Sequence, residues 1–512
     1  MAIFPSRRSF AALLRTGASI AVIGATLCLA GAAHCASPDD KTLLRGVAIV
    51  NTRDGTLAPD MSILIDHGKI SDIRPDGGAA PDASTIVIDA RGKFVVPGYL
   101  DMHAHAFENP KETQRILTLM LANGITGWRQ MSGSPKLLEE RREGKLPVAP
   151  LDPELLIMPG ALITPLVAGS TERAVAEVKK QKDQGTDFIK VVIANPSVFF
   201  AALGEAKQDG LPFAGHLQNG VDAALASKAG MTAIEHLGPG ETLLLSCSTD
   251  EAELREKFVK SPPMQGFPFN LLYLTPFQDS LMGVIEKKII TRPSVLYGQE
   301  EIARFRRVVD SFSEEKCRQL AAVFVANGTW QVPTMIRVKT SELSDHAEFL
   351  NDPDLRYIAP DEAENWRKSE QKYLDQFNAS DRQTLQDAYA LRLKVVKLFD
   401  SEGVKMLAGD DVGGGIWGVP GFGLHHEFDE LAQAGLTPMR ILQMTTLNGA
   451  EFLGRTTSMG SVDVGKNADL VLLQANPIDS AQNLHKIDAV VRAGHYFSRQ
   501  DLDGMLEKSK NH

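Results

Sequence analysis

Two histidines that stand one residue apart are the strongest chemical signal in this chain. His103 and His105 close the segment Val95–His105 (VVPGYLDMHAH), in which an apolar run leads through a turn into the pair. Side chains two residues apart on a strand point to the same side, so both imidazoles can reach one cation. Such a pair alone is a weak signal, but four further ligand-type residues each accompany a later apolar, strand-like run: Lys190, His216, His236 and Asp411.

These residues predict a centre for divalent metal ions. Imidazole nitrogens and carboxylate oxygens are donors that zinc binds readily in proteins, and Mn²⁺, Co²⁺ and Fe²⁺ are compatible with the same donors. We predict two divalent ions, with zinc as the first choice. The predicted ligands are His103, His105, Lys190, His216, His236 and Asp411.

Lys190 needs a chemical change before it can serve as a ligand. A protonated lysine offers three donors and no lone pair. The apolar run Phe188–Ile193 predicts a buried position, where an unpaired charge is costly. Carboxylation by CO2 would turn the amine into an anionic carbamate with two oxygens. We therefore predict a carboxylated Lys190 that bridges the two ions; the alternative is a surface lysine at the end of a strand.

The predicted centre indicates hydrolysis. A water that bridges two divalent ions loses a proton near neutral pH, and the resulting hydroxide can attack a polarised carbonyl. Asp411 is the predicted catalytic residue, first as general base towards that water and then as general acid towards the leaving amine. Asp101 and Asp410 are predicted to support the ligands without binding metal themselves.

Both ends of the chain show short alternating strands. Residues 42–96 and two later runs, Gly465–Leu473 and Ala489–Gly494, have strand-like patterns bounded by Gly, Asp and Pro. We predict a small β-sandwich domain that is built from both chain ends and interrupted by a barrel. The predicted boundaries are 1–36 for a signal peptide, 37–98 and 456–512 for the two parts of the sandwich, and 99–455 for the barrel.

The middle of the chain alternates strands with helices. One strand-like run precedes His103, and seven more follow: Ile125–Arg129, Leu155–Met158, Phe188–Ile193, Leu211–His216, Ala233–His236, Thr329–Thr334 and Val404–Gly409. The clearest helical pattern spans Ser380–Glu402. Eight such units predict an α/β fold, a (β/α)8 TIM barrel, whose active site lies at the C-terminal ends of the strands. The segment 99–455 is longer than a barrel without insertions, which has about 250 residues. The additional residues fall mainly in 238–327 and 336–380, and we predict that they cover the site.

Composition and the N-terminus bear on where the protein works. The net charge of -10 argues against a nucleic-acid partner. Arg7, Arg8 and Arg15 precede a short, weakly apolar stretch, which predicts a signal peptide of the twin-arginine type. The protein is therefore predicted to be exported, periplasmic or secreted, without stable membrane insertion after signal removal. A Sec signal, or a lipoprotein attached through Cys35, is the alternative.

The chain has few cysteines outside the predicted signal. Cys247 and Cys317 are the two that the mature chain keeps. Two cysteines in a large exported protein do not form a disulfide framework. The sequence leaves open whether they pair.

The motifs resemble those of the amidohydrolase superfamily over nearly all of the mature chain. Pro97–His105 (PGYLDMHAH) is similar to its strand-one signature. Ala408–Asp411 (AGDD) is similar to its strand-eight A-G-T-D pattern, with Asp410 in place of the usual threonine. Three further segments are similar to the closing helices and the returning sandwich: Leu436–Met439, Thr445–Ala450 and Gly465–Leu473.

Within the superfamily, the chain resembles the prolidase-like branch, related to Xaa-Pro dipeptidases and imidazolonepropionase. The resemblance rests on Asp187–Lys190, Gly215–His216 and Ile234–Leu237. It implies hydrolysis of dipeptides, N-acyl amino acids or aryl amides. Val192 departs from the tyrosine of many relatives, which removes one expected substrate contact.

The resemblance also implies how the ligands divide between the ions. His103 and His105 would hold the first ion together with Asp411. His216 and His236 would hold the second, and Lys190 would bridge the two.

Two residues are predicted to contact a small-molecule substrate. Arg129 ends a strand and could bind a substrate carboxylate, with an ion pair at the barrel mouth as the equal alternative. His425, in the segment Leu424–Phe428, falls near the predicted mouth and could contact the substrate or cap the site.

The leading predicted function is hydrolysis of an amide bond in a peptide-like substrate. The same hydroxide could attack a lactone, a carbamate or a phosphotriester, and the loops that would decide cannot be placed from the sequence. A non-enzymatic scaffold predicts missing ligands, whereas all six are present. The sequence is also compatible with a homo-oligomer.

Overall fold

The computed structural model describes residues 41–78, 82–218, 220–260 and 297–510. All of them fall within the unit Ala36–His512. The predicted signal peptide, 1–36, lies outside the described residues, as does part of the predicted covering segment 238–327. None of the helices in the described ranges is long and apolar enough to cross a membrane.

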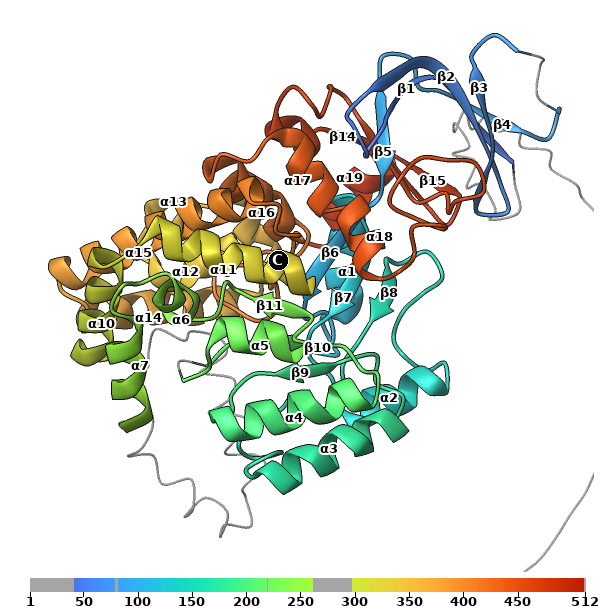
Figure 1. The fold of residues 1–512 in the computed structure, drawn as a ribbon. Coiled ribbons are helices and arrows are strands. Elements are labelled where there is room, and N and C mark those ends of the chain that lie inside the picture. Colours follow the sequence, from blue (N-terminus) through green and yellow to red (C-terminus); the bar gives the residue numbers. More distant parts are fainter. Residues whose placement is uncertain (1–40, 79–81, 219, 261–296, 511–512) are drawn as a thin grey trace, which may run out of the picture. The chain divides into compact units, whose positions relative to one another are not determined.

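Strands from both chain ends come together, as predicted, but they are assigned to one mixed sheet rather than to the two layers of the predicted β-sandwich. In Figure 1 the blue N-terminal strands lie beside the red C-terminal strands. The junction is the antiparallel pair of β5 and β13, in which Leu470 pairs with Pro97 and Leu473 with Phe94. The strand order is β15-β14-β13-β5-β1-β2-β3, with β4 paired to β1. The members are β1 (Thr42–Val50), β2 (Leu57–Asp66), β3 (Lys69–Pro75), β4 (Ile86–Asp89), β5 (Phe94–Pro97), β13 (Leu470–Leu473), β14 (Ile487–Arg492) and β15 (His495–Ser498).

Seven of the eight predicted central runs form strands. They are β6 (Tyr99–Ala104), β7 (Ile125–Gln130), β8 (Glu154–Ile157), β9 (Ile189–Val191), β10 (Phe213–Gly215), β11 (Ala233–Glu235) and β12 (Trp330–Val332). They are assigned to a three-stranded sheet, β6-β7-β8, and a four-stranded sheet, β12-β11-β10-β9. Every described neighbouring pair in these sheets is parallel, which is the arrangement expected of strand–helix repeats.

The eighth run makes backbone contacts with both sheets. The Gln331 N–H donates to the Lys405 carbonyl at 3.0 Å, and the Met102 N–H donates to the Ala408 carbonyl at 2.9 Å. Parallel bridges also join Pro159 to Phe188 and Ala104 to Val412. The central strands of the described residues are thus assigned to two separate sheets, and short backbone contacts link the edges of these sheets.

Helices follow the central strands, and several of them begin at residues with capping side chains. They include α1 (Thr113–Ala122), α2 (Pro135–Arg142), α3 (Thr171–Asp183), α4 (Pro196–Gln208) and α5 (Ala223–Ala229). Each of three of these helices has a capping side chain that accepts a hydrogen bond from its first turn: Ser170 for α3, Asn195 for α4 and Asp222 for α5. Such capping satisfies donors that a helix start leaves without an intrahelical partner.

The predicted long helix is present almost as expected. It is α15 (Ala379–Ser401), and Asn378 caps it two residues before the predicted start. The segments predicted to cover the site contain α6 (Thr242–Ser246), α7 (Glu251–Lys260), α10 (Gln299–Asp310), α11 (Glu314–Asn327), α12 (Met335–Glu342), α13 (Ala347–Leu350), η2 (Pro353–Tyr357) and α14 (Pro360–Gln376). The C-terminal part adds α16 (Phe422–Gln433), α17 (Pro438–Met444), α18 (Leu447–Phe452), η3 (Ala481–His485) and α19 (Arg499–Lys508).

Cys247 and Cys317 form a disulfide, which answers the question that the sequence left open. Cys247 caps the end of α6, and Cys317 lies in α11, with their Cα atoms 4.5 Å apart. Both residues are fully buried. The bond closes a 70-residue separation and so ties the segment after His236 to α11.

We expect reduction of this disulfide to lower the free energy of unfolding by about 2–4 kcal/mol, because the cross-link restricts the unfolded chain. The measurement is urea-induced unfolding with and without dithiothreitol. The double variant Cys247→Ala/Cys317→Ala serves as the control and should not respond to the reductant. A wild-type midpoint that stays unchanged once thiol titration shows two free cysteines would contradict the prediction.

Candidate active site

The predicted metal ligands converge at the C-terminal ends of the central strands. His103 lies in β6, His105 directly follows it, and His216 and His236 directly follow β10 and β11. The ring centroids of His103 and His236 are 4.6 Å apart, those of His216 and His236 5.0 Å, and those of His103 and His105 5.5 Å. Residues that are up to 133 positions apart in the sequence thus share one small volume.

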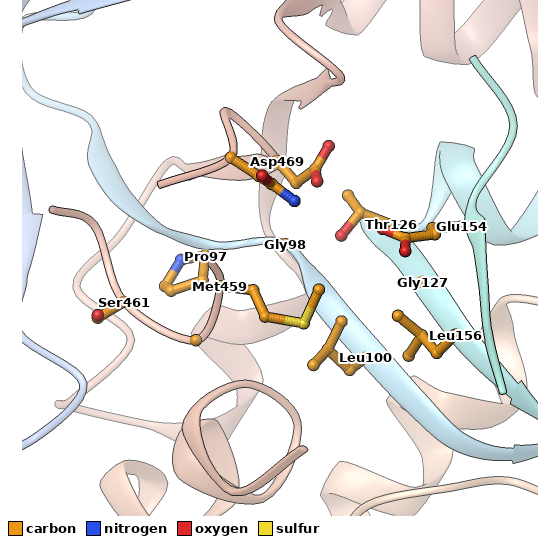
Figure 2. A pocket seen from close by; sticks show the side chains of 12 residues that line it. Pro97, Gly98, Leu100, Thr126, Gly127, Glu154, Leu156, Met459, Ser461 and Asp469 are labelled. Carbon is orange, nitrogen blue, oxygen red and sulfur yellow. The ribbon is translucent and has the colours of Figure 1, made fainter. Parts of the chain in front are cut away.

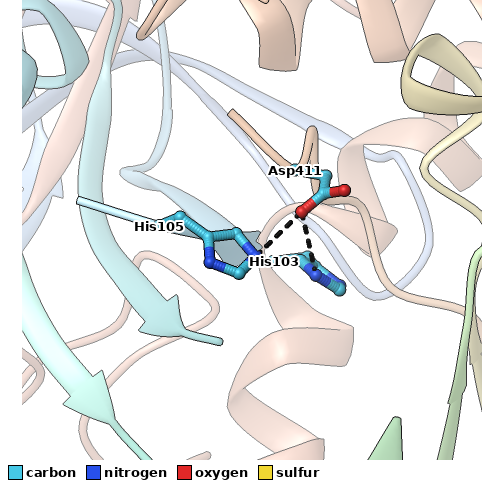
Figure 3. Close-up of side chains that lie close together, drawn as sticks. All are labelled: His103, His105 and Asp411. Atoms are coloured by element: carbon cyan, nitrogen blue, oxygen red, sulfur yellow. Dashed lines mark ion pairs between the residues drawn. The ribbon is translucent and has the colours of Figure 1, made fainter. Parts of the chain in front are cut away.

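Asp411 connects the first two histidines. Its Oδ1 lies 3.2 Å from His103 Nε2 and 2.9 Å from His105 Nε2, as Figure 3 shows. The three side chains are buried, and ligand atoms from all three lie within 4.8 Å of one another. His236 Nε2 lies 3.9 Å from the second oxygen, Oδ2. Two imidazoles and one carboxylate that face a common point fit the donor set of a divalent metal ion.

Lys190 lies within the same group although it sits in the middle of an apolar strand. Its Nζ is 3.2 Å from His103 Nε2, and only 2% of the residue is exposed. Burial lowers the pKa of the Lys190 amine to about 8, even though the carboxylates of Asp411 and Glu235 act in the opposite direction. A larger share of this amine is therefore neutral near pH 7 than for a surface lysine.

The electrostatics of the group favour the neutral imidazoles of His216 and His236 and an ionised Asp411. Burial lowers the pKa of His216 to about 3 and that of His236 well below its usual value. Burial alone would raise the pKa of Asp411, but the neighbouring His103 and His236 hold it well below its usual range. These are the protonation states in which both residue types bind metal.

Unusual backbone geometry positions two of the ligands. Asp411 and His236 have φ values of 57° and 58°, a region that non-glycine residues seldom adopt. Thr334 has a φ of 44°, and its Oγ1 lies 2.6 Å from His236 Nδ1. Strain of this kind costs about 1–3 kcal/mol per residue and persists where surrounding contacts enforce it, often at functional sites.

Gly409 allows the close approach of the eighth strand to β6. A Cβ atom at this position would lie 2.6 Å from the backbone nitrogen of His103. The Asp411 N–H donates to the His103 carbonyl at 2.8 Å, just beyond this contact. The glycine of the A-G-D-D segment therefore sets how near Asp411 comes to the histidines.

Glu235 is a functional residue that the sequence analysis missed. It is fully buried, and its Oε2 accepts a hydrogen bond from His103 Nδ1 at 2.8 Å. Its Oε1 accepts one from Arg129 Nη1 at 3.0 Å. Burial alone would raise the pKa of Glu235, but Arg129 and His103 lower it to about 2. A carboxylate in this position keeps the proton of His103 on Nδ1 and leaves Nε2 free to bind a metal ion.

We expect the Glu235→Gln variant to bind divalent metal about 10- to 100-fold more weakly, because the charge that orients His103 is lost. Competition with a chromogenic chelator measures the affinity, and circular dichroism checks the fold. Glu205→Gln is the matched control, since Glu205 lies on α4 and its ion-pair partner is Lys179. Equal metal affinity in the wild type and the Glu235→Gln variant would show that this carboxylate does not position the ligand.

Asp101 and Asp410 lie behind the ligands, as predicted. Asp101 Oδ1 accepts a hydrogen bond from the His103 N–H at 3.0 Å, and Asp410 Oδ1 accepts one from the Val412 N–H at 2.8 Å. Burial raises the pKa of Asp101 to about 7, and burial together with Asp101 raises the pKa of Asp410 well above its usual value. The two carboxyl groups also hydrogen-bond to each other, so they share a proton while fixing the backbone on either side of the site.

The two residues predicted to contact substrate, Arg129 and His425, have other partners in the structure. Arg129 is fully buried, pairs with Glu235, and has the rings of Phe188 and Phe452 at 4.7 and 5.1 Å from its guanidinium carbon. This geometry corresponds to the ion-pair alternative, located in the interior rather than at the mouth. His425 lies on α16, where its Nε2 is 2.9 Å from the Asn123 carbonyl.

His425 also lies near the opposite end of β6 from the predicted ligands. Its ring packs against Tyr99, the first residue of β6, whereas His103 is near the last. Sequence spacing could not reveal this, because it depends on how α16 packs against Tyr99 and Asn123. The structure thus gives His425 a packing role and does not support a substrate contact.

A separate pocket lies at the opposite ends of the central strands (Figure 2). Its lining includes Gly98, Thr126 and Glu154, which stand within one residue of the first residues of β6, β7 and β8. Met459 and Asp469 complete the side towards the chain-end sheet. The lining contains none of the six predicted ligands, so this pocket is distinct from the metal-ligand group.

Comparison with known proteins points to one family. Residues 392–496 match the Amidohydrolase family. The chain is 26% identical over 218 residues to an adenine deaminase from Chelativorans sp. (strain BNC1). The aligned region covers 38% of this chain and 35% of that protein. The chain spans only 14% to 35% of the length of the first three curated relatives it matches.

Solved structures share the fold over most of the chain. A bottromycin amidohydrolase has a TM-score of 0.64 at 18% identity, covering 92% of this chain and 89% of its own. A Xaa-Pro dipeptidase with methionine bound in its active site has a TM-score of 0.58 at 18% identity, covering 90% of this chain and 100% of its own. These findings confirm the resemblance predicted from the motifs: residues 392–496 match the Amidohydrolase family, and the two solved structures share the fold.

Proposed function

We propose that this protein is a metal-dependent hydrolase that cleaves an amide bond in a peptide-like substrate, a dipeptide or an N-acyl amino acid. The observation that carries the proposal is the convergence of His103, His105 and Asp411 with Lys190 and His236 at the ends of parallel strands. The named relatives, a deaminase, a dipeptidase and an amidohydrolase, act on carbon–nitrogen bonds and support the reaction class.

We propose two divalent ions, zinc as the first choice, with His103, His105 and Asp411 around one and His216 and His236 around the other. When bound, such ions polarise a carbonyl and lower the pKa of water. Asp411 is the proposed general base and acid. Its Oδ1 lies beside His103 and His105, while Oδ2 accepts a hydrogen bond from Arg337 Nε at 3.0 Å. The two oxygens thus have separate contacts, so one carboxylate can both hold a metal and move a proton.

We propose that Lys190 carries a CO2 adduct and bridges the ions. Its buried position and lowered pKa support this, because only the neutral amine attacks CO2. An unmodified ammonium 3.2 Å from His103 Nε2 would repel any cation bound there, whereas a carbamate would attract it.

We further propose that the two central sheets and the eighth run form a closed (β/α)8 barrel, and that the chain-end strands form a β-sandwich. Buried side chains from several strands meet in one interior cluster, among them Leu100, Phe188, Ala233, Val332 and Leu407. The hydrogen bonds of the eighth run to both sheet edges also support closure.

Export to the periplasm or beyond is proposed on two grounds. The N-terminal sequence has the features of a signal peptide. The buried Cys247–Cys317 disulfide is the kind of bond that persists in oxidising compartments. Fractionation of cells that express the full chain tests this; a protein found only in the cytoplasm would contradict it.

A substrate panel tests the reaction class. Metal-loaded enzyme is assayed with dipeptides, N-acyl amino acids, lactones, carbamates and aryl phosphotriesters, and the proposal expects the highest kcat/KM with an amide. A lactone or triester cleaved far faster than every amide would assign the same site to the alternative reaction.

A further inference from the structure

His236, a proposed ligand of the second ion, begins an unusual stretch of backbone. His236, Leu237, Gly238 and Gly240 have φ values of 58°, 52°, 71° and 68°, so four of five consecutive residues are left-handed. For His236 and Leu237 this conformation is unfavourable and persists only where surrounding contacts enforce it. The groups that hold this stretch therefore decide where the imidazole lies.

A buried arginine holds the far end of this stretch. Arg392 belongs to α15 and is only 1% exposed. Its Nη2 donates to the Gly240 carbonyl at 2.6 Å. A hydrogen bond from a guanidinium is stronger than one between neutral groups. Because Gly240 stands four residues after His236, this bond fixes the end of the left-handed stretch relative to α15.

The same guanidinium also holds the helix on the other side of His236. Arg392 Nη1 donates to Glu342 Oε2 at 2.5 Å, and Glu342, the last residue of α12, is itself buried. This helix begins directly after Thr334, whose Oγ1 lies 2.6 Å from His236 Nδ1. One side chain thus connects the segment that follows His236 with the helix behind its ring partner.

The packing of α12 against α15 does not by itself require an arginine. Replacing a buried ion pair by apolar side chains of similar volume is often neutral for stability or even stabilising. Apolar side chains would not, however, provide a donor for the Gly240 carbonyl. The guanidinium is therefore explained by the stretch that it holds.

We propose that Arg392 is a positioning residue that sets the place of His236 and, with it, the affinity of the site for the second divalent ion. The inference rests on the proposed function, which assigns His236 to that ion. Arg392 acts through Gly240 and Glu342. The proposed ligands of the first ion, His103, His105 and Asp411, lie on other segments of the chain.

Stepwise titration of the metal-free full chain with Co²⁺, followed by its visible absorption, tests the proposal. The double variant Arg392→Met/Glu342→Leu should bind the second ion about 10- to 100-fold more weakly, with little change for the first. Its apolar pair leaves no buried charge, so thermal unfolding should stay close to that of the wild type. Arg392→Lys should show a smaller loss, because it keeps the charge but lacks the forked donors.

Lys339→Met/Glu430→Gln is the matched control. Lys339 of α12 donates to Glu430 of α16 at 2.7 Å, and the two side chains are 13% and 6% exposed. This buried pair thus joins the same helix to a different neighbour. The variant should bind both ions as the wild type does.

Hydrogen exchange provides a readout that depends on neither metal nor turnover. In the metal-free protein, the backbone amides of 236–242 should exchange faster in both Arg392 variants than in the wild type, whereas those of 100–105 should not change. If the wild type binds fewer than two ions or cleaves no amide, the proposed function fails, and the exchange rates still decide whether Arg392 holds this stretch.

Three results would overturn the proposal. The first is a second ion bound as tightly by both folded Arg392 variants as by the wild type, or an unchanged exchange rate in 236–242. The second is an equal loss of affinity for both ions, which would indicate general loosening. The third is a double variant that fails to fold, which would assign the ion pair to stability instead.

Discussion

The Asp411→Asn variant is expected to lose at least about 1,000-fold in kcat, because one change would remove both a proposed metal ligand and the proposed general base. Asparagine has nearly the same shape but cannot take up a proton at this position. Its amide would also replace the carboxylate oxygen that lies 2.9 Å from His105 Nε2. Steady-state kinetics with the best amide substrate, together with metal analysis of the same sample, measure both losses.

Asp410→Asn is the control for this prediction. Asp410 is adjacent in the sequence, but its carboxyl group faces Asp101 and the Val412 N–H rather than the histidines. Because burial already favours its protonated form, a neutral amide should be tolerated far better there. Equal losses in the two variants would mean that Asp411 has no special role in the proton transfer.

The Lys190→Ala variant is expected to lose bound metal and nearly all activity, because the proposed bridging carbamate cannot form. Alanine also leaves a space beside His103, which lies 3.2 Å from the lysine Nζ in the intact site. A short carboxylate such as acetate or propionate should enter this space and restore part of the activity. Rates measured over a range of added carboxylate test the prediction.

Lys182→Ala is the control for a lysine on a nearby helix, since Lys182 is exposed on α3 and pairs with Asp209. It should keep full activity and should not respond to acetate. Intact-protein mass spectrometry under native conditions can detect the additional mass of CO2 on wild type. An unmodified lysine in fully active, metal-loaded enzyme would exclude the proposed bridge.

The convergence of the predicted metal ligands could largely be foreseen from the sequence. His103 and His105 follow the two-residue alternation of a strand, and His216 and His236 each end a short apolar run. In parallel strands such ends meet at one edge, so the residues had to converge once the strand order was fixed. Lys190 fitted less well because it stands inside its run, yet its length carries the amine to His103.

The residues that support the ligands were not predictable in the same way. Glu235 was visible as a charged residue inside the apolar run Ala233–His236, which is costly unless paired. Its partners, His103 and Arg129, lie 132 and 106 positions away, and no local pattern links them. Arg337, whose Nε donates to Asp411 Oδ2, was harder still to predict. The sequence around Arg337 gives no indication of the loop that packs against it.

Tertiary packing also decided what the sequence left open. The predicted helix Ser380–Glu402 begins earlier because Asn378, rather than Ser380, caps it. The placement of His425 depended on where α16 crosses the strands, which periodicity does not encode. The disulfide between Cys247 and Cys317 required the end of α6 to meet α11, and no local sequence pattern predicts that contact.

Metal dependence is the most direct test of the account. The full chain is stripped with a chelator, and divalent metal is added back stepwise while hydrolysis of an N-acyl amino acid and bound metal are measured on the same sample. The account predicts no hydrolysis without metal and full activity at two bound ions per chain, with both lost in the Asp411→Asn variant. Undiminished hydrolysis by the metal-free protein would contradict it.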